Sequence, residues 1–201
     1  MGATFVLPLC PLRGAVLLPG ERIEVPSLGP EAEAAVGLAI EYGNTVVASL
    51  ADGESVHEVG VTAAVDDLTE EQTRLHGLGR CRLLSLVDED VPLVRAERFP
   101  ERRISPARAE VLAQLLDRRY GRFRSRLGKP VPTRNETERL GSLTWRVAAG
   151  LDLTADQQQG FLNVPDALTR GKLLLLVLRE MERRERFLRQ FSHLRTGQPW
   201  N

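Results

Sequence analysis

The chain has 201 residues, with 27 lysines and arginines against 27 aspartates and glutamates, so its formal net charge is zero. Hydrophobic residues make up 42% and charged residues 27% of the chain, an ordinary globular composition that excludes disordered and fibrous proteins. Two cysteines cannot build a disulfide framework, the N-terminus lacks the pattern of a secretory signal, and no apolar run could span a bilayer, so we expect a cytoplasmic protein without a membrane segment.

The first half of the chain is predicted to be rich in β-strands. It consists of short apolar runs, several with apolar and polar residues in alternation, separated by Gly, Pro and Asp. One helix is expected inside this region, at Pro30–Gly43, because Pro30 suits the first turn and Gly43 suits the C-cap. Gly77 and Gly79 lie within the strand series, where we expect a bend or bulge. The expected strands are Thr4–Leu9, Glu21–Val25, Thr45–Leu50, Val59–Val65, Gln72–Gly79, Arg80–Val87 and Pro92–Phe99.

The second half changes to helical periodicity. A helix at Ser105–Leu127 begins with a Ser N-cap followed by Pro. In the final helix, Asp166–Phe191, Asp166 is expected to be the cap, and the first half is apolar nearly all round and is expected to be buried. Thr133–Leu151 and Thr154–Asn163 are expected as two further helices, the second capped by Thr154. The apolar face of the helix at Ser105–Leu127 is expected to consist of Val111, Leu112, Leu115 and Leu116.

The charges divide where the periodicity changes. Residues 1–100 carry 7 basic and 16 acidic side chains, a net of −9, whereas residues 101–201 carry 20 basic and 11 acidic side chains, a net of +9. We therefore predict an α+β protein with a β-rich subdomain at 1–100 and a helical subdomain at 101–201 that ends in a long helix. We interpret the opposite charges as complementary fields of two parts of one fold.

The sequence contains no pattern that indicates an enzyme. The histidines His57, His76 and His193 are scattered, and Cys10 and Cys81 lack the spacing of a zinc site, so we expect no catalytic residue and no metal. Each cysteine is interpreted as a buried structural thiol. Neither a GxSxG elbow nor a GxxxxGK[ST] phosphate loop occurs, and no cofactor is expected.

An ordered series of motifs runs along nearly the whole chain. Phe5–Val25 contains the pattern LPL-x-PLR-x-x-VLLPG, HGLGRCRLLSL fits G-x-x-R followed by alternating apolar residues, and the closing helices carry a late arginine, Arg170. This series, over about residues 5–192, resembles the N-terminal substrate-binding domain of Lon proteases. The resemblance implies a PUA-like β-rich pseudo-barrel with one helix, followed by a helical bundle.

The chain departs from a full Lon protease in one respect that matters for function. Lon proteases continue into an ATPase module and a Ser-Lys peptidase, and this sequence has no phosphate loop. The resemblance therefore implies a stand-alone, non-enzymatic protein that engages unfolded or degron-bearing polypeptides.

An apolar groove between the two halves is the expected place for such binding. Arg13 offers a forked donor that could hold neighbouring carbonyls. The apolar candidates for the groove walls are Leu12, Leu17, Leu18, Phe99, Trp145 and Phe161.

Two alternatives remain open at this stage. PUA-like folds elsewhere bind RNA, and Arg118–Lys129 interleaves Tyr120 and Phe123 with candidate anion contacts, although the acidic β half argues against RNA. The protein could instead be an adaptor or regulator of a Lon-type protease, or associate with itself through its opposite charges. The candidate anion contacts are Arg118, Arg119, Arg122 and Arg124.

Overall fold

A closed five-stranded barrel forms the N-terminal half of the molecule. The computed structural model describes residues 3–25, 29–53, 55–68, 72–88, 92–135 and 137–190. Its sheet runs in the order β1-β7-β6-β5-β3-β4, and an additional pairing of β1 with β3 closes the first five of these strands into a ring. That pairing is parallel, whereas all the others are antiparallel. The strands are β1 Thr4–Arg13, β2 Arg22–Val25, β3 Thr45–Asp52, β4 Ser55–Val56, β5 Val59–Leu68, β6 Thr73–Asp88 and β7 Leu93–Arg98.

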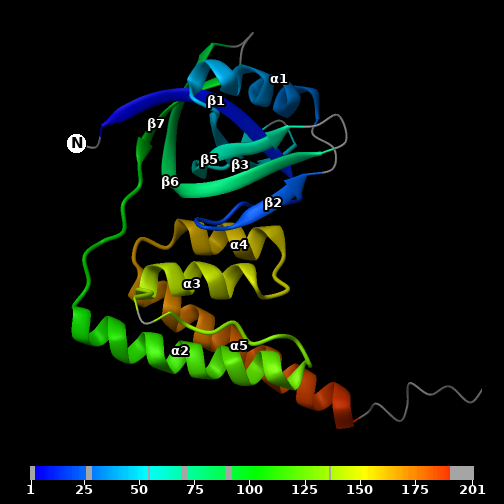
Figure 1. Ribbon diagram of the computed structural model, residues 1–201, viewed down its shortest axis with the longest axis vertical. Coiled ribbons are helices and arrows are strands. Elements are labelled where there is room, and N and C mark those ends of the chain that lie inside the picture. Colours follow the sequence, from blue (N-terminus) through cyan, green and yellow to red (C-terminus); the bar gives the residue numbers. More distant parts are fainter. Residues whose placement is uncertain are drawn as a thin grey trace, which may run out of the picture.

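One helix covers the barrel and four others form the C-terminal half, which confirms the predicted α+β fold with a pseudo-barrel and a bundle. Figure 1 shows the barrel in the upper part of the view, the helices α2–α5 below it, and the segment after β7 descending between them. The long strand β6 replaces the two strands that we predicted as separate, with a bulge at Leu78 between them, where a bend or bulge was expected. The helices are α1 Pro30–Leu38, η1 Ala39–Tyr42 (a 3-10 helix), α2 Pro106–Arg126, α3 Leu140–Ala149, α4 Ala155–Asn163 and α5 Ala167–Gln190.

The predicted helix caps are confirmed at three of the helix ends. Thr154 and Gln157 form a reciprocal capping box at the start of α4. Asp166 accepts the backbone N–H of Thr169 at 2.8 Å and so caps α5. Gly43 ends η1 in the left-handed conformation that glycine adopts without strain.

The predicted helix at Thr133–Leu151 is wrong in its first part, because α3 begins only at Leu140. Asn135 uses its side-chain oxygen to accept the backbone N–H of Thr137 at 3.3 Å, which offers this backbone an alternative to the helix. Its carbonyl also accepts the N–H of Glu138 at 2.9 Å. The approach to α3 is therefore a turn rather than a helical extension.

The buried stripes of the two long helices differ from the prediction. On α2, Leu112 and Leu116 are buried, but Val111 is 70% exposed and Leu115 is also exposed. The buried positions of α2 continue with Tyr120 and Phe123. The buried face of the helix therefore includes Leu112 but not its neighbour Val111. On α5 the buried residues are Ala167, Arg170, Gly171, Leu174, Leu178 and Glu182. The first half of α5 is thus buried on one face only, since Leu173 and Leu176 are exposed, and Phe191 lies outside the described residues.

A single hydrophobic cluster joins the two halves. It contains residues of the barrel, such as Leu12 and Leu75, together with Leu143 and Leu174 of the bundle. A second, smaller cluster around Leu9, Val47 and Cys81 lies on the opposite face of the strands, because successive side chains point to opposite sides.

Hydrogen bonds rather than ion pairs reinforce this junction. Gln159 donates from its amide to the carbonyl of Val59 at 2.8 Å, and Arg80 donates from Nη1 to the carbonyl of Leu162 at 2.8 Å. Among pairs whose two members are both described, every ion pair joins residues of the same half. Hydrogen bonds to carbonyls and apolar contacts therefore make the direct junction, and the complementary fields of the two halves stay a prediction. The division of the chain into subdomains at 1–100 and 101–201 stays a prediction.

Candidate functional site: a groove between the barrel and the helices

A groove with a volume of about 1540 Å³ lies between the barrel and the bundle. Its barrel side is formed by the turn after β1 and by β6 near Leu78. Its helical side is formed by the start of α2 and by α3, and the segment 98–104 crosses between the two sides. Phe99, which is half-buried, and Trp145 of α3 both line it, as the sequence predicted for a groove at this junction.

Four of the predicted wall residues do not line the groove. Leu12, Leu17, Leu18 and Phe161 are each less than 9% exposed and belong to the hydrophobic cluster that joins the halves. The prediction that they line the groove rests on their apolar character. Burial alone does not separate them from Trp145, which is also in this cluster and only 7% exposed; they are excluded because they lie outside the lining of the groove.

Five side chains of the groove and its floor form an alternating stack of guanidinium groups and aromatic rings. The guanidinium of Arg82 lies 4.9 Å from the centroid of Phe99, and that of Arg80 lies 4.5 Å from it. Arg80 is also 5.5 Å from the Trp145 ring, whose centroid lies 3.5 Å from the guanidinium of Arg170. The stack runs from exposed Arg82 to fully buried Arg170, and it joins β6 to α3 and α5.

Arg80 ties the barrel to the end of α4. Its Nη1 donates to the carbonyl of Leu162 at 2.8 Å and to that of Val164 at 2.6 Å. These two carbonyls lie at the end of α4, where no further helical turn supplies donors. Burial lowers the pKa of Arg80, while Glu101 and Asp166 act in the opposite direction. Arg80 is therefore a buried cation whose bonds go to neutral acceptors.

Arg170 anchors the inner end of the stack. Its Nε donates to the hydroxyl of Thr144 at 2.9 Å, and its Nη2 donates to the carboxylate of Glu101. Burial lowers the pKa of Arg170 to about 10, a value that still leaves it charged at neutral pH. Among the buried side-chain atoms of the described residues, Nη2 of Arg80 and Nη1 of Arg170 have no hydrogen-bond partner.

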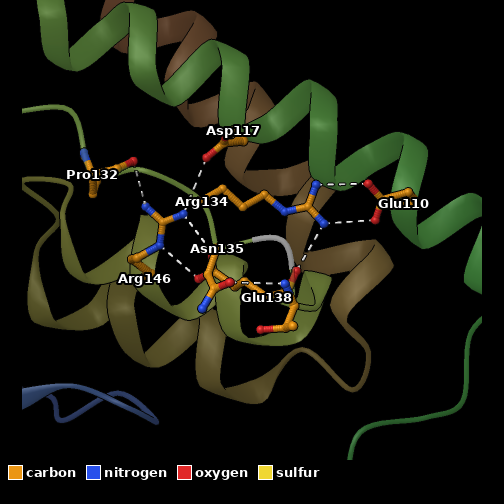
Figure 2. A network of polar contacts seen from close by, with 8 residues as sticks. Glu110, Asp117, Pro132, Arg134, Asn135, Glu138 and Arg146 are labelled. Carbon is orange, nitrogen blue, oxygen red and sulfur yellow. Dashed lines mark hydrogen bonds and ion pairs between the residues drawn. The ribbon is translucent and has the colours of Figure 1, made fainter.

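A network of ion pairs makes the far wall of the groove rigid. Arg146 binds Glu138 with both Nε and Nη2, at 2.9 and 2.8 Å, and reaches Asp117 of α2 at 3.4 Å. Arg134 binds Glu110 with two nitrogens at 3.0 and 2.9 Å. Figure 2 shows the two guanidinium groups lying between α2 and the turn before α3. The side-chain bonds raise the pKa of both arginines, so these charges are neutralised within the network.

The turn on the barrel side depends on a close approach between two motifs. The N–H of Glu21 donates to the carbonyl of Leu18 at 3.0 Å, and Gly20 between them has a φ of +81°, so the Pro19-Gly20 pair forms a type II turn. A Cβ on Gly77 of β6 would lie 2.3 Å from the carbonyl oxygen of Leu18. The PLR-x-x-VLLPG and G-x-x-R motifs are therefore in direct contact.

Arg13 lies away from the groove. It is exposed and its Nη2 is 3.5 Å from the carboxylate of Glu31 on α1, rather than holding carbonyls as the sequence suggested.

The predicted anion contacts on α2 are only partly available to a ligand. Arg119 is bound to Glu182 at 2.6 Å, and Arg124 donates to the carbonyl of Pro130 at 3.1 Å. Arg118 and Arg122 are exposed. The aromatic residues between these arginines, Tyr120 and Phe123, are buried, so they cannot stack on bases. This finding removes the aromatic half of the argument for RNA.

The two cysteines are not poised for nucleophilic chemistry. Cys10 and Cys81 are buried and free, and burial raises the pKa of each thiol to about 12, so they are protonated at neutral pH. Within the described ranges, no group of three or more His, Cys, Asp or Glu side chains is placed to hold a metal ion. His193 lies outside these ranges, and no helix within them is long and apolar enough to cross a membrane.

Sequence reasoning missed the three charged residues that organise the groove, Arg80, Glu101 and Arg170, as a group. Arg80 is the arginine of the G-x-x-R motif and Arg170 is the late arginine, so both positions were visible as motifs. Nothing in their spacing showed that they flank the same tryptophan, because 90 residues separate them in the chain.

Comparisons with known proteins support this description. The sequence model of the ATP-dependent protease La (LON) substrate-binding domain matches residues 6–180. The N-terminal domain of the Mycobacterium avium complex Lon protease is similar in structure, with a TM-score of 0.70 at 14% identity, and the match covers 87% of this chain and 98% of that one. A Lon N-terminal domain protein from Xanthomonas campestris gives a TM-score of 0.60 at 22% identity, with 86% and 98% covered. None of the curated proteins compared with the chain gives a significant match. Because the family model covers most of the sequence, the chain belongs to the LON substrate-binding domain family.

Proposed function

We propose that the protein binds unfolded or degron-bearing polypeptide segments in the groove between its halves and performs no reaction of its own. The observation that carries the proposal is the groove itself, in a chain of the LON substrate-binding domain family. Its volume of about 1540 Å³ is larger than that of typical small-molecule sites, which suits a polypeptide segment.

The chemistry of the groove supports binding rather than catalysis. Several charged side chains of its walls are held by other charged side chains, as Arg146 is by Glu138, and these bonds join an arginine to a carboxylate rather than a nucleophile to a base. Phe99 presents a half-buried ring for apolar contact. We propose no ATPase activity, because the sequence contains no phosphate loop.

The partners that we propose are therefore polypeptides, either clients or a Lon-type protease that the protein would serve as adaptor or regulator. Cytoplasmic localisation and salt-sensitive self-association stay predictions. A pull-down from native cells, followed by identification of clients and proteases, distinguishes a client receptor from an adaptor.

A groove-blocking variant tests the binding site. Ser142 is exposed on α3 and lines the groove, so Ser142→Trp should fill the groove without disturbing the core. Ser125→Trp, at an exposed position of α2 that does not line the groove, is the matched control. We measure fluorescence polarisation with labelled, reduced and carboxymethylated lactalbumin, which is permanently unfolded.

We expect Ser142→Trp to weaken binding by about tenfold or more, corresponding to about 1.4 kcal/mol, whereas Ser125→Trp leaves it unchanged. Absence of binding by the unmodified protein, or equal affinity of both variants, would contradict the proposed site. Salt-sensitive retention of random RNA in a filter assay, without polypeptide binding, would instead support the nucleic-acid alternative.

A further inference from the structure

Four basic and four acidic side chains line the groove, and three of the four carboxylates are held by arginines, which leaves more unpaired arginines than unpaired carboxylates among the described lining residues. Most of its charges are paired: Glu101 with Arg170, Glu110 with Arg134, and Glu138 with Arg146. Such bidentate and buried pairs have little residual attraction for a ligand, because each charge is already satisfied.

Two arginines at the groove have no such partner. Arg98, at the end of β7, and Arg139, which precedes α3, both line the groove and are exposed. Within the described part of the chain, neither makes an ion pair or side-chain hydrogen bond. The only unpaired carboxylate among the described lining residues is that of Glu21, and it accepts the N–H of Leu18 at 3.0 Å.

A third cation of the groove lining is buried. Arg80 lines the groove, is only 7% exposed, and bonds only to the carbonyls of Leu162 and Val164. Its Nη2 has no partner among the described residues. A buried cation without a bonded carboxylate adds positive potential to the groove above it, since little water lies between to screen it.

The start of α3 adds to this field. The helix begins at Leu140 without a side-chain cap, and Gly141 and Ser142 of its first turn line the groove. Unsatisfied N–H groups at a helix N-terminus favour negative charge. Glu101 lies close to Gly141 and supplies part of the negative charge that this helix end favours. Its carboxylate also binds Arg170.

We propose that the groove prefers polypeptide segments that carry carboxylate side chains beside apolar ones, with Arg98 and Arg139 as the specificity-determining contacts. This inference rests on the proposed polypeptide binding and deepens it. Apolar side chains would contact Phe99, while the acidic side chains pair with the two exposed arginines.

The test uses three fluorescein-labelled peptides of equal length that share the same Leu and Phe positions. Their remaining polar positions are all Glu, all Gln or all Lys. We expect affinity to fall in the order Glu, Gln, Lys, with the Glu peptide binding roughly threefold to tenfold more tightly than the Gln peptide at low salt. The difference should shrink as the ionic strength rises, because both arginines are exposed.

Two double variants, each of which removes two positive charges, test whether the preference for the Glu peptide arises at the groove. Arg98→Gln/Arg139→Gln should abolish the preference for Glu while leaving the affinity for the Gln peptide unchanged. Arg179→Gln/Arg186→Gln, at exposed positions of α5 that do not line the groove, should retain the preference.

The outcomes separate this inference from the proposed function. Equal binding of the Glu and Lys peptides, or loss of the preference in both double variants, overturns the inference while polypeptide binding stands. Failure of all three peptides and of unfolded lactalbumin to bind overturns both.

Discussion

The guanidinium of Arg170 lies 3.5 Å from the centroid of the Trp145 ring, and no part of the arginine reaches the surface. A fully buried cation is costly unless its surroundings replace the lost hydration. Here the ring, the hydroxyl of Thr144 and the carboxylate of Glu101 share that role. The pair therefore fixes the position of α5 against α3 and of the segment that leads from the barrel.

Replacement of this arginine should destabilise the whole fold. We expect Arg170→Met to lower the free energy of unfolding by about 2–4 kcal/mol, because it leaves Thr144 and the half-buried Glu101 without their partner. Arg179→Met, at an exposed position of the same helix, should change it by less than about 0.5 kcal/mol. Urea denaturation measures both. Adding Glu101→Gln to Arg170→Met should cost little more, whereas full additivity would show that the pair is not coupled.

The junction between the halves should loosen when the guanidinium of Arg80 is replaced, because its Nη1 donates to both carbonyls and its planar group lies over two aromatic rings. Arg80→Lys keeps the charge but cannot reach the two carbonyls of Leu162 and Val164 in the same geometry or stack in the same way. We expect faster amide hydrogen exchange at the end of α4 and a loss of about 2 kcal/mol. Arg82→Lys, at the exposed end of the stack, is the control. Equal exchange in the two variants would show that Arg80 does not hold the junction.

Local signals in the sequence predicted most of the elements and their caps. Alternating apolar residues marked six of the seven strands, and Thr154 and Asp166 cap the helices that follow them. The two-residue strand β4 is too short to leave a periodic signal. The start of α3 was misplaced because the turn at Asn135 competes with the helix through its side chain, a preference that periodicity does not record.

The groove was predicted in its place but only partly in its residues. Phe99 and Trp145 line it, whereas Leu17 and Leu18 lie in the core. Apolar type alone cannot tell a groove wall from a core position, since the hydrophobic effect drives both inward. The ion pairs and the stack that shape the groove join residues far apart in the chain. Their contacts follow from the closure of the barrel on the bundle, which no local pattern specifies.

The contact between the PLR-x-x-VLLPG and G-x-x-R motifs should be sensitive to a single methyl group. Because a Cβ on Gly77 would meet the backbone oxygen of Leu18 at 2.3 Å, Gly77→Ala should cost about 1–3 kcal/mol or more. Gly79→Ala is the matched control in the same strand, since its nearest neighbour would be Thr62 Oγ1 at 3.9 Å. Thermal unfolding measures both variants. A melting temperature for Gly77→Ala equal to that of Gly79→Ala would contradict the close approach.

Stability should decline in alkaline solution because of the two buried thiols. Burial raises the pKa of Cys10 and of Cys81 from 9.0 to about 12. Above pH 9 the unfolded chain therefore releases protons that the folded chain retains, so the free energy of unfolding falls as the pH rises towards 12 and is unaffected below 9. By about pH 10 the loss should reach about 1.4 kcal/mol for each thiol. Urea titrations of the unmodified protein and of Cys10→Ala/Cys81→Ala isolate the effect, since every other group titrates in both. The unmodified protein should lose more stability than the variant over this interval, and parallel pH profiles would show that the thiols titrate normally in the fold.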